Sequence, residues 1–460
     1  MSGFTFRAVS IFLLGISATL TLSAPASGST YTAIETFCTG TCTSGETPVA
    51  PLVRDSAGRL YGTATLGGVT HSHGVVFRLT PSGSTSYTYK VLYDFCSSSG
   101  CIDGDAPNAG LIIDSSGNLY GTTKFGGANN KGLVFELVKP TSGTTWTLTP
   151  VYSFCSTMNA FGICTDGKTP LSKLTYSGAE SGLPYNGTDL LFGMTNRGGF
   201  DDSTHLHDYG VLYVLQLSGG TWSQKTKVLF NGPNGEEPDA ALVMDASTNV
   251  LWGTTPLGGS SGTGAAFMLT PGADLWNDPW TEKIIYNFCW DFHQPCPDGR
   301  DPNGVVRDAG GNIYGAASDG GNGTFPSLGF GLVYKLYDGG CMENGVPGFW
   351  CNTTLFEFCN STGCPDGNQP PEGSDLIMDS SGNLYGTTLH GGGAADAGII
   401  YKLSGGTETV LYAFCPSSGC ADGSRPMAGV IMDPAGNLYG TTSQGGSGSP
   451  GKGTVFKLTP

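Results

Sequence analysis

The chain has 460 residues and a formal net charge of −16, and only 13% of its residues are charged. With 37 acidic and 21 basic residues it lacks the basic surplus that binds nucleic-acid phosphates, and its few charged residues exclude a long coiled coil. Its 74 glycines and 27 prolines predict many turns, while 38% hydrophobic residues suffice for a packed core.

Residues 1–26 have the pattern of an export signal. Arg7 is the only charge in the first 34 residues, an apolar stretch occupies 8–23, and 24–26 (A-P-A) supply the small residues of a cleavage site. The stretch is shorter than the ~20 residues that span a bilayer, although an uncleaved anchor is the alternative. We expect residues 27–460 to form one secreted domain, with the periplasm or the cell surface as alternative locations.

The first predicted strand of the mature chain, 31–37 (Y-T-A-I-E-T-F), precedes Cys38 and resembles segments that recur along the chain, such as V-L-Y-D-F-C at 91–96. A second recurring string is D-S-S-G-N-L-Y-G-T-T, at Asp114–Thr123 and again at Asp379–Thr388. Its aromatic position occurs seven times, 54 to 72 residues apart: Tyr61, Tyr120, Phe192, Trp252, Tyr314, Tyr385 and Tyr439. Such internal repetition is typical of repeat architectures.

Each repeat is predicted to contain four short strands. The first follows a proline, as at 111–113, and the second is N-L-Y-G-T-T. The third is G-x-V-F-x-L, as at Gly132–Leu137, and the fourth ends in F-C. D-x-x-G-N between the first two strands is a tight turn. Repeated four-stranded antiparallel sheets form a β-propeller, and seven copies predict an all-β, seven-bladed one.

The last repeat ends at Pro460, after its third strand. We expect the spare strand at 31–37 to complete this blade and to close the ring, which removes open sheet edges. An open β-solenoid is the alternative.

The 14 cysteines form seven close pairs in the sequence. Disulfides suit an exported protein, whereas zinc sites prefer tighter C-x₂₋₄-C units, so we interpret the pairs as neighbouring disulfides. The predicted bonds join Cys38 to Cys42, Cys96 to Cys101, Cys155 to Cys164, Cys289 to Cys296, Cys341 to Cys351, Cys359 to Cys364 and Cys415 to Cys420.

The motif G-N-L-Y-G-T-T-x-x-G-G…G-x-V-F-K-L resembles the GloVer-type extracellular tandem repeats of bacteria and, more loosely, the propeller repeats of two-component sensor ectodomains. The resemblance covers essentially the whole mature chain and implies a secreted bacterial protein. GloVer-type proteins often carry a C-terminal surface anchor, whereas this chain ends without an apolar tail, so we expect free secretion rather than anchoring. We also expect a monomer. The family defines no activity, so the resemblance transfers no catalytic residue.

The residue before each Gly-Gly differs in every repeat, although its surroundings recur. We expect the Gly-Gly loops and the Cys-Cys loops to lie on one face, around the central funnel, where a ligand-binding rim need not repeat its residues. The candidate ligand-binding residues are Phe125, Arg197, Asp319, His390 and Gln444. The alternative is that the position varies because it is exposed and unimportant.

Two further residue sets have side chains that can ligate metals, although no cofactor is expected. The pairs His71/His73 and His205/His207, near Asp201, Asp202 and Asp208, are one set, but solvated loop histidines explain them more simply. The C-x-D-G-x-x-P loops repeat an aspartate that suits either a structural cation such as calcium or ordinary turn bonding, which we favour. These aspartates are Asp103, Asp166, Asp298, Asp366 and Asp422.

The zinc-metalloprotease motif H-E-x-x-H is missing from the chain, and the residue before each Gly-Gly varies on a repeated frame. We therefore expect a non-catalytic extracellular recognition or scaffold module for carbohydrate, peptide or protein. One alternative is a polysaccharide hydrolase or lyase that uses Asp319, Arg197 and His390. The other alternative is a structural envelope protein.

Overall fold

The computed structural model describes residues 28–38, 40–69, 72–83, 85–199, 208–290, 296–321, 329–343, 346–447 and 451–460. The expected signal at 1–26 lies outside these ranges. The described part contains 28 strands and one 3₁₀ turn, η1 (Ser99–Cys101), but no α-helix, and none of its segments is a helix long and apolar enough to cross a membrane.

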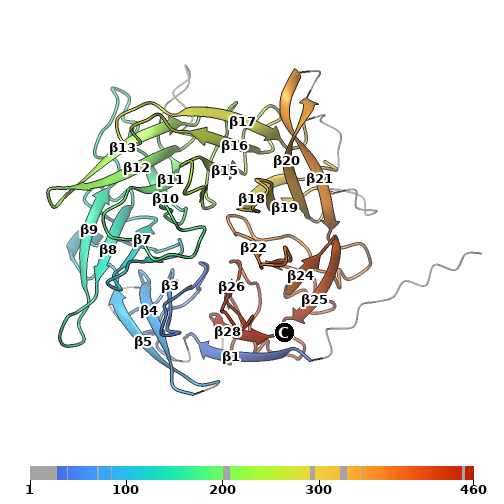
Figure 1. Ribbon diagram of the computed structural model, residues 1–460. Helices are drawn as coiled ribbons and strands as arrows, with labels where there is room; N and C mark the ends of the chain where they lie inside the picture. Colours follow the sequence, from blue (N-terminus) through green and yellow to red (C-terminus); the bar gives the residue numbers. More distant parts are fainter. Residues whose placement is uncertain are drawn as a thin grey trace, which may run out of the picture.

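Seven four-stranded antiparallel sheets surround a central axis, which confirms the seven-bladed propeller (Figure 1). The innermost strands of blades 1 to 7 are β2 (Val53–Arg54), β6 (Ile112–Ile113), β10 (Lys168–Pro170), β14 (Val243–Met244), β18 (Arg300–Arg307), β22 (Ile377–Met378) and β26 (Ile431–Met432). The second strands are β3 (Leu60–Ala64), β7 (Leu119–Thr123), β11 (Leu191–Arg197), β15 (Leu251–Thr255), β19 (Ile313–Asp319), β23 (Leu384–Thr388) and β27 (Leu438–Thr442).

The third and fourth strands form the outer half of each blade. The third strands are β4 (Val75–Pro81), β8 (Leu133–Val138), β12 (Val211–Ser218), β16 (Ala265–Thr270), β20 (Leu332–Glu343), β24 (Ile399–Ser404) and β28 (Thr454–Thr459). The fourth strands are β5 (Tyr87–Asp94), β9 (Thr147–Ser153), β13 (Thr221–Leu229), β17 (Thr281–Asn287), β21 (Val346–Glu357), β25 (Thr407–Ala413) and, for blade 7, β1 (Thr30–Thr36).

The N-terminal strand closes the ring, as the sequence predicts. Strand β1 pairs antiparallel with β28, with Tyr31 opposite Leu458 and Ala33 opposite Phe456. Tyr31 also stacks on Tyr412 of blade 6, with 4.1 Å between ring centroids. The two ends of the described chain therefore share one sheet.

Aromatic side chains join neighbouring blades at equivalent places. The phenylalanine that immediately follows each fourth strand packs on the aromatic ring of the third strand in the next blade, as Phe95 does on Phe135. The seven pairs have centroid distances of 4.9 to 5.6 Å. The ring of Phe135 lies over Gly121, where an added Cβ would be 2.8 Å from it. This crowding explains why the motif keeps its glycine.

A glycine at the start of each third strand packs against the proline of the next blade. Gly132 has a φ of 108°, and an added Cβ would lie 2.3 Å from Cδ of Pro170. The backbone N–H of Thr169 donates to the carbonyl of Lys131 beside this contact (2.8 Å). These contacts tie blade 2 to blade 3, and equivalent ones recur between the other blades.

All seven predicted disulfides are present, between the predicted neighbours. Six lie in the loops that connect blades, and the seventh joins the two strands of the long β20–β21 hairpin. The six loop disulfides join Cys38 to Cys42, Cys96 to Cys101, Cys155 to Cys164, Cys289 to Cys296, Cys359 to Cys364 and Cys415 to Cys420. The hairpin disulfide joins Cys341 to Cys351.

The second cysteine of each loop disulfide also holds the Gly-Gly loop of the blade that follows it. The cysteine carbonyl accepts a hydrogen bond from the backbone N–H of the second glycine, as Cys164 does from Gly199 (2.8 Å). The same bond joins Cys42 to Gly68, Cys101 to Gly127, Cys296 to Gly321, Cys364 to Gly392 and Cys420 to Gly446, at 2.8 to 3.0 Å. The prediction treated these cysteines only as partners in covalent bonds, whereas the structure shows that their backbone also positions a neighbouring loop.

The long β20–β21 hairpin is fastened to blade 4 near its tip. The buried carboxylate of Glu343 accepts hydrogen bonds from the side chains of Asn287 and Ser260. The hairpin is therefore held at its tip as well as by its disulfide.

Candidate functional site

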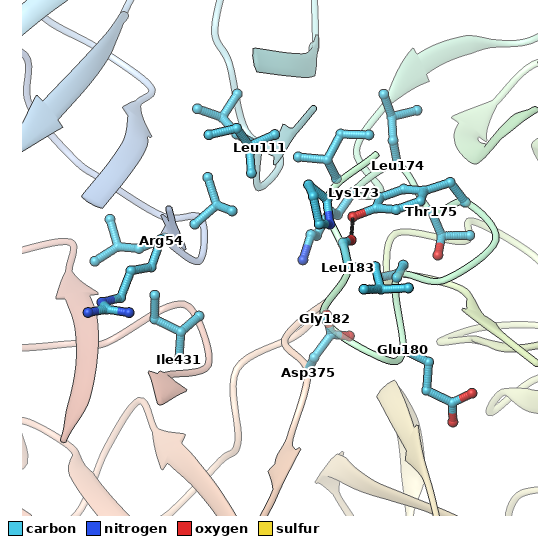
Figure 2. A pocket seen from close by; sticks show the side chains of 18 of the residues that line it. Arg54, Leu111, Lys173, Leu174, Thr175, Glu180, Gly182, Leu183, Asp375 and Ile431 are labelled. Carbon is cyan, nitrogen blue, oxygen red and sulfur yellow. Dashed lines mark hydrogen bonds between the residues drawn. The ribbon is translucent and has the colours of Figure 1, made fainter. Parts of the chain in front are cut away.

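A cavity of about 840 Å³ lies on the propeller axis, and all seven blades line it. We call this cavity the funnel; Figure 2 shows it from close by. Its lining includes the D-x-x-G turns at Asp55 and Asp114, so it lies toward the end of the molecule that carries these turns. Its volume falls within the roughly 300–1,000 Å³ of small-ligand sites.

The wall of the funnel is mostly aliphatic. Each blade contributes the residue paired with, or bridged to, the aromatic residue of its second strand. These wall residues are Val53, Ile112, Thr175, Val243, Val306, Ile377 and Ile431. Five of them are only partly buried, so the wall offers apolar surface to a ligand.

The funnel is richer in basic groups than the chain as a whole. Five basic and four acidic side chains line it, whereas the chain contains 21 and 37. The basic residues are Arg54, Arg59, Lys139, Lys173 and Arg307, and the acidic ones are Asp55, Asp114, Glu180 and Asp375. An anionic group therefore meets a more favourable local potential here than the net charge of −16 implies.

Some of these charges are held by protein partners. The carboxylate of Asp55 accepts from Arg59 Nε (2.5 Å), and Asp114 accepts from its own turn. Arg307 lies 3.0 Å from a carboxylate oxygen of Asp245, and its guanidinium stacks 4.8 Å from the ring centroid of Trp252. These groups are therefore less available to a ligand.

Three other basic residues of the funnel are not held in this way. Among the described residues, the side chains of Arg54, Lys139 and Lys173 make no ion pair within 4 Å and donate no hydrogen bond. Figure 2 shows Arg54 and Lys173 on different sides of the funnel, so they do not converge on one point.

Lys173 and Asp375 mark the floor of the funnel. Both also line a second cavity of about 120 Å³, so they lie where the two cavities meet. Burial raises the pKa of Asp375 to about 6, and the positive charge of Lys173 opposes this rise. The floor therefore carries one cation and one carboxyl group that is readily protonated.

The floor residues break a seven-fold pattern. A large aliphatic residue precedes each wall residue, as Leu52 precedes Val53. The position before that aliphatic residue is occupied, from blade 1 to blade 7, by Pro51, Gly110, Lys173, Ala241, Gly304, Asp375 and Gly429. We call these seven residues the axial ring. An added Cβ on Gly304 would lie 1.8 Å from Oδ1 of Asp375, so the space beside this glycine is taken by the aspartate. Lys173 is the only cation of the ring.

Blade 3 places a long loop at the funnel, residues 176–189, where the other blades have the D-x-x-G-N turn or a close variant of it. The backbone of Tyr185 bonds to that of blade 2, which fixes one end of the loop. Glu180 on this loop lies 3.8 Å from Arg307 of blade 5. Leu183 also lines the funnel and is 60% exposed. The loop therefore adds one charge and one apolar side chain to the site.

The second cavity is narrow and acidic. Asp239, Glu372 and Asp375 line it, with Lys173 as its only basic residue among those described. Burial and the negative charge of Glu372 raise the pKa of Asp239 to about 7. The segments that lead into the innermost strands meet here, which leaves less space than at the other end.

The five predicted rim residues occupy equivalent positions at the ends of their second strands. Phe125, His390 and Gln444 each lie opposite a residue of the blade-connecting loop, as Phe125 does opposite Asp105. Arg197 and Asp319 lie opposite the first residues of β10 and β18. None of the five lines the funnel or the second cavity among the described residues. The repeat pattern thus predicted a binding surface at the Gly-Gly loops, whereas the larger cavity lies toward the D-x-x-G turns.

Three of the rim residues have local partners in separate blades. Arg197 pairs with Glu237, and Asp319 accepts from Arg300 (2.8 Å). His390 Nδ1 lies 2.8 Å from a carboxylate oxygen of Asp396. Gln444 is exposed, and the ring of Phe125 is 42% exposed. A role for these residues in ligand binding stays a prediction.

The predicted disulfide cysteines also lie away from the cavities. No cysteine of the described chain lines the funnel or the second cavity. Cys164, Cys296, Cys364 and Cys420 lie instead in the blade-connecting loops, where their carbonyls hold the Gly-Gly loops. The disulfides are therefore structural and do not belong to the candidate site.

The proposed histidine site falls largely outside the described residues, which omit His71, His205, His207, Asp201 and Asp202. His73 Nδ1 lies 2.8 Å from Asp105 Oδ1. Two described clusters combine a pair of cysteines with His73 or with Glu46. Both cysteine pairs are disulfide-bonded, so they offer no thiolate to a metal.

The repeated C-x-D-G aspartates support the turn interpretation. Asp103 accepts from the backbone N–H of Ser97 and from the hydroxyl of Tyr93, and Asp166 is bonded in the same way. Asp366 differs because Phe356 replaces the tyrosine. Burial raises the pKa of Asp366, which has one carboxylate oxygen without a hydrogen-bond partner among the described residues.

Four residues of the funnel were not expected from the sequence: Lys173, Asp375, Glu180 and Leu183. Lys173 and Asp375 could have been found by aligning the repeats on the proline and the aromatic residue, because they are the only charged residues at the axial-ring position. The other two lie before 189–195 (D-L-L-F-G-M-T), the copy of the recurring string that contains Phe192 and lacks the D-x-x-G turn.

Many solved structures are similar in shape, at low identity. One is a protein of unknown function from Dyadobacter fermentans, 11% identical, with a TM-score of 0.42, covering 94% of this chain and 99% of that one. Another is a Trypanosoma rangeli sialidase in complex with sialic acid (10%, TM-score 0.39, 95% and 59%). A third is PorZ, a type-IX secretion component of Porphyromonas gingivalis (12%, TM-score 0.40, 83% and 47%). These values do not support an assignment of activity.

No curated protein matches the chain. The model of the Gloeobacter/Verrucomicrobia repeat matches residues 19–181 and 337–460, which together make up more than half of the sequence. The chain therefore belongs to the Gloeobacter/Verrucomicrobia repeat family, as the G-N-L-Y-G-T-T motif indicated.

Proposed function

We propose that this protein is a non-catalytic recognition module that binds an extracellular ligand in its funnel. The observation that carries the proposal is the 840 Å³ cavity, with its aliphatic wall and the nine charged side chains that also line it. An apolar cavity with a small number of polar groups is the usual form of a ligand site. Seven disulfides support a location in an oxidising compartment, and we propose secretion as a monomer.

The ligand class proposed from the sequence is carbohydrate, peptide or protein. The funnel favours a small ligand, or one extended segment of a larger one, because its volume is that of a small-molecule site. The five residues at the Gly-Gly end, Phe125 among them, are proposed as a separate contact surface for a larger partner.

A thermal-shift screen of the mature chain against short peptides and oligosaccharides tests this proposal, because a ligand that binds the native state raises the unfolding temperature. The variant Leu183→Glu places a charge at an exposed position of the funnel and should abolish the shift. The matched control is Leu229→Glu, which changes another exposed leucine outside the funnel. Phe125→Ala should leave the shift unchanged.

If Leu183→Glu and Leu229→Glu behave alike, the ligand does not bind in the funnel. If Phe125→Ala alone removes the shift, the ligand binds at the Gly-Gly end. A protein that no ligand stabilises would instead favour the structural envelope role.

A hydrolase acting on polysaccharide is the second candidate. Glu180 and Asp375 both line the funnel, and burial raises the pKa of both carboxyl groups, as a general acid requires. Release of reducing ends from soluble polysaccharides tests this candidate. Glu180→Gln should abolish the release, whereas Glu357→Gln, outside the funnel, should not.

A further inference from the structure

We infer that the funnel recognises the C-terminal end of a peptide, with the terminal carboxylate bound by Lys173 and the aliphatic side chains against the wall. This inference rests on the proposed binding function of the funnel and specifies its ligand. It follows from three properties of the site: a single cation on the floor, an aliphatic wall and charged groups of both signs above them.

The floor provides one ammonium group close to the axis. Five members of the axial ring are proline, glycine or alanine, so Lys173 and Asp375 are its only charged side chains. The stem of Lys173 packs beside blade 2, where an added Cβ on Gly110 would be 3.3 Å from Cδ of the lysine. The stem is therefore confined by its neighbours.

The ammonium group of Lys173 can donate hydrogen bonds to a ligand. It carries three N–H donors, and none of them has a hydrogen-bond acceptor among the described residues. Asp375 interacts with it electrostatically, but no ion pair within 4 Å joins these two described groups. A ligand carboxylate would satisfy the donors with short, charge-assisted hydrogen bonds.

The aliphatic wall favours a ligand whose carboxylate is attached to apolar groups. Six of its seven residues are aliphatic, and the seventh is Thr175. The hydroxyl groups of an acidic sugar would lose water against such a wall without gaining hydrogen bonds, which is unfavourable. Aliphatic side chains lose no hydrogen bonds there and gain from the removal of apolar surface from water.

The charged groups farther from the floor favour a peptide over a fatty acid as the ligand. Arg54, Lys139 and Glu180 line the funnel together with the apolar Leu183. The amide groups of a peptide backbone can exchange hydrogen bonds with such charged groups, whereas the alkyl tail of a fatty acid cannot. A peptide therefore matches the floor, the wall and the charged groups at once.

The direct test compares N-acetyl-Leu-Val-Leu with a free C-terminal carboxylate and the same peptide as its amide, by isothermal titration calorimetry on the mature protein. We expect the amide to bind roughly 10- to 100-fold more weakly, the factor typical of a lost hydrogen bond to a charged group. Lys173→Gln should weaken binding of the acid by a similar factor and should abolish the preference for the acid. Lys173→Arg should retain it.

Lys131→Gln is the control, because Lys131 is an exposed lysine that lines neither the funnel nor the second cavity. It should leave the preference for the acid intact. Unfolding temperatures of all variants separate a loss of binding from a loss of folding, and Lys173→Arg provides a second reading if Lys173→Gln does not fold.

Equal affinity for the acid and the amide would overturn the inference; if Leu183→Glu still weakened both, the funnel would remain the binding site. Tighter binding of octanoate or of trigalacturonate than of the peptide acid would also overturn it and would identify a different ligand class. If none of these probes binds, the inference that the funnel binds a peptide C-terminus is wrong. The thermal-shift screen against other ligands then tests the proposed recognition function separately.

Discussion

Three tyrosines occupy a core position at which the other four blades carry phenylalanine. They are Tyr213, Tyr334 and Tyr401, and the exposed fraction of each is 1% or less. Their hydroxyl groups have no hydrogen-bond partner among the described residues. Each hydroxyl lies over the glycine of the second strand: an added Cβ on Gly193 would be 2.4 Å from the oxygen of Tyr213. We predict that replacing these tyrosines with phenylalanine stabilises the protein.

The magnitude follows from the cost of a buried, unpaired hydroxyl, which is about 1–3 kcal/mol. The change to phenylalanine keeps the ring that packs on Phe154, 5.0 Å away between centroids, and removes only the oxygen. We therefore expect each substitution to raise the free energy of unfolding by about 1 kcal/mol. The three residues lie in different blades, so the triple variant should gain about 3 kcal/mol.

Equilibrium unfolding in urea, with the disulfides intact, measures this gain as a shift of the midpoint at constant slope. The reverse change, Phe135→Tyr in blade 2, is the matched control and should destabilise by about 1–3 kcal/mol, because it buries a hydroxyl over Gly121. A loss of stability in Tyr213→Phe would refute the reasoning, since it would mean that the hydroxyl is satisfied in the folded protein.

Three further predictions concern contacts between and within blades. Gly132→Ala should destabilise by about 2–3 kcal/mol in urea unfolding, because the new Cβ meets Pro170 at a φ of 108°, whereas Gly143→Ala, with nothing within 4 Å, should lose only about 1 kcal/mol. Replacing both Cys155 and Cys164 with serine should cost about 2–3 kcal/mol, the loop entropy of a nine-residue separation, and a loss no larger than that of an exposed Ser→Ala variant would contradict it. Burial and the nearby Asp366 raise the pKa of Glu408 to about 8, above its usual 4.5, so the folded protein retains a proton that the unfolded chain releases, and stability should fall as the pH rises from about 4.5 to 8. Glu408→Gln should therefore stabilise more at pH 8 than at pH 5, because the amide carries no charge at either pH, and an equal effect at both pH values would count against the assignment.

The architecture was predictable because its determinants lie in short strings that recur. The glycine of N-L-Y-G-T-T is retained because an aromatic ring covers it, as Phe135 covers Gly121. The D-x-x-G-N turn is local, since Asp114 bonds to the backbone two and four residues later. Ring closure required only that 31–37 match a fourth strand. Each of these inferences depends on neighbouring residues or on the repeat itself.

The position of the cavity depends instead on how seven blades converge, which no single repeat encodes. The residue before each Gly-Gly varies between repeats, yet at two of these positions Arg197 and Asp319 pair with charged neighbours. The width of the funnel results from side chains that all seven blades contribute. The location of Lys173 at the funnel follows only from the folded arrangement of the blades, so its role could not be predicted from its own repeat.

The deviations from the repeat are therefore more informative about function than the variable loops. Positions that join blades, such as Gly132 with Pro170, are constrained because a larger residue would force the blades apart. At the axial ring the constraint is also steric, and small residues dominate. A lysine there must extend into the shared central space, and folding gains little from a partly compensated charge in an aliphatic site. Its presence in blade 3, together with the inserted loop at 176–189, is better explained by a ligand than by stability, and both features lie at the funnel.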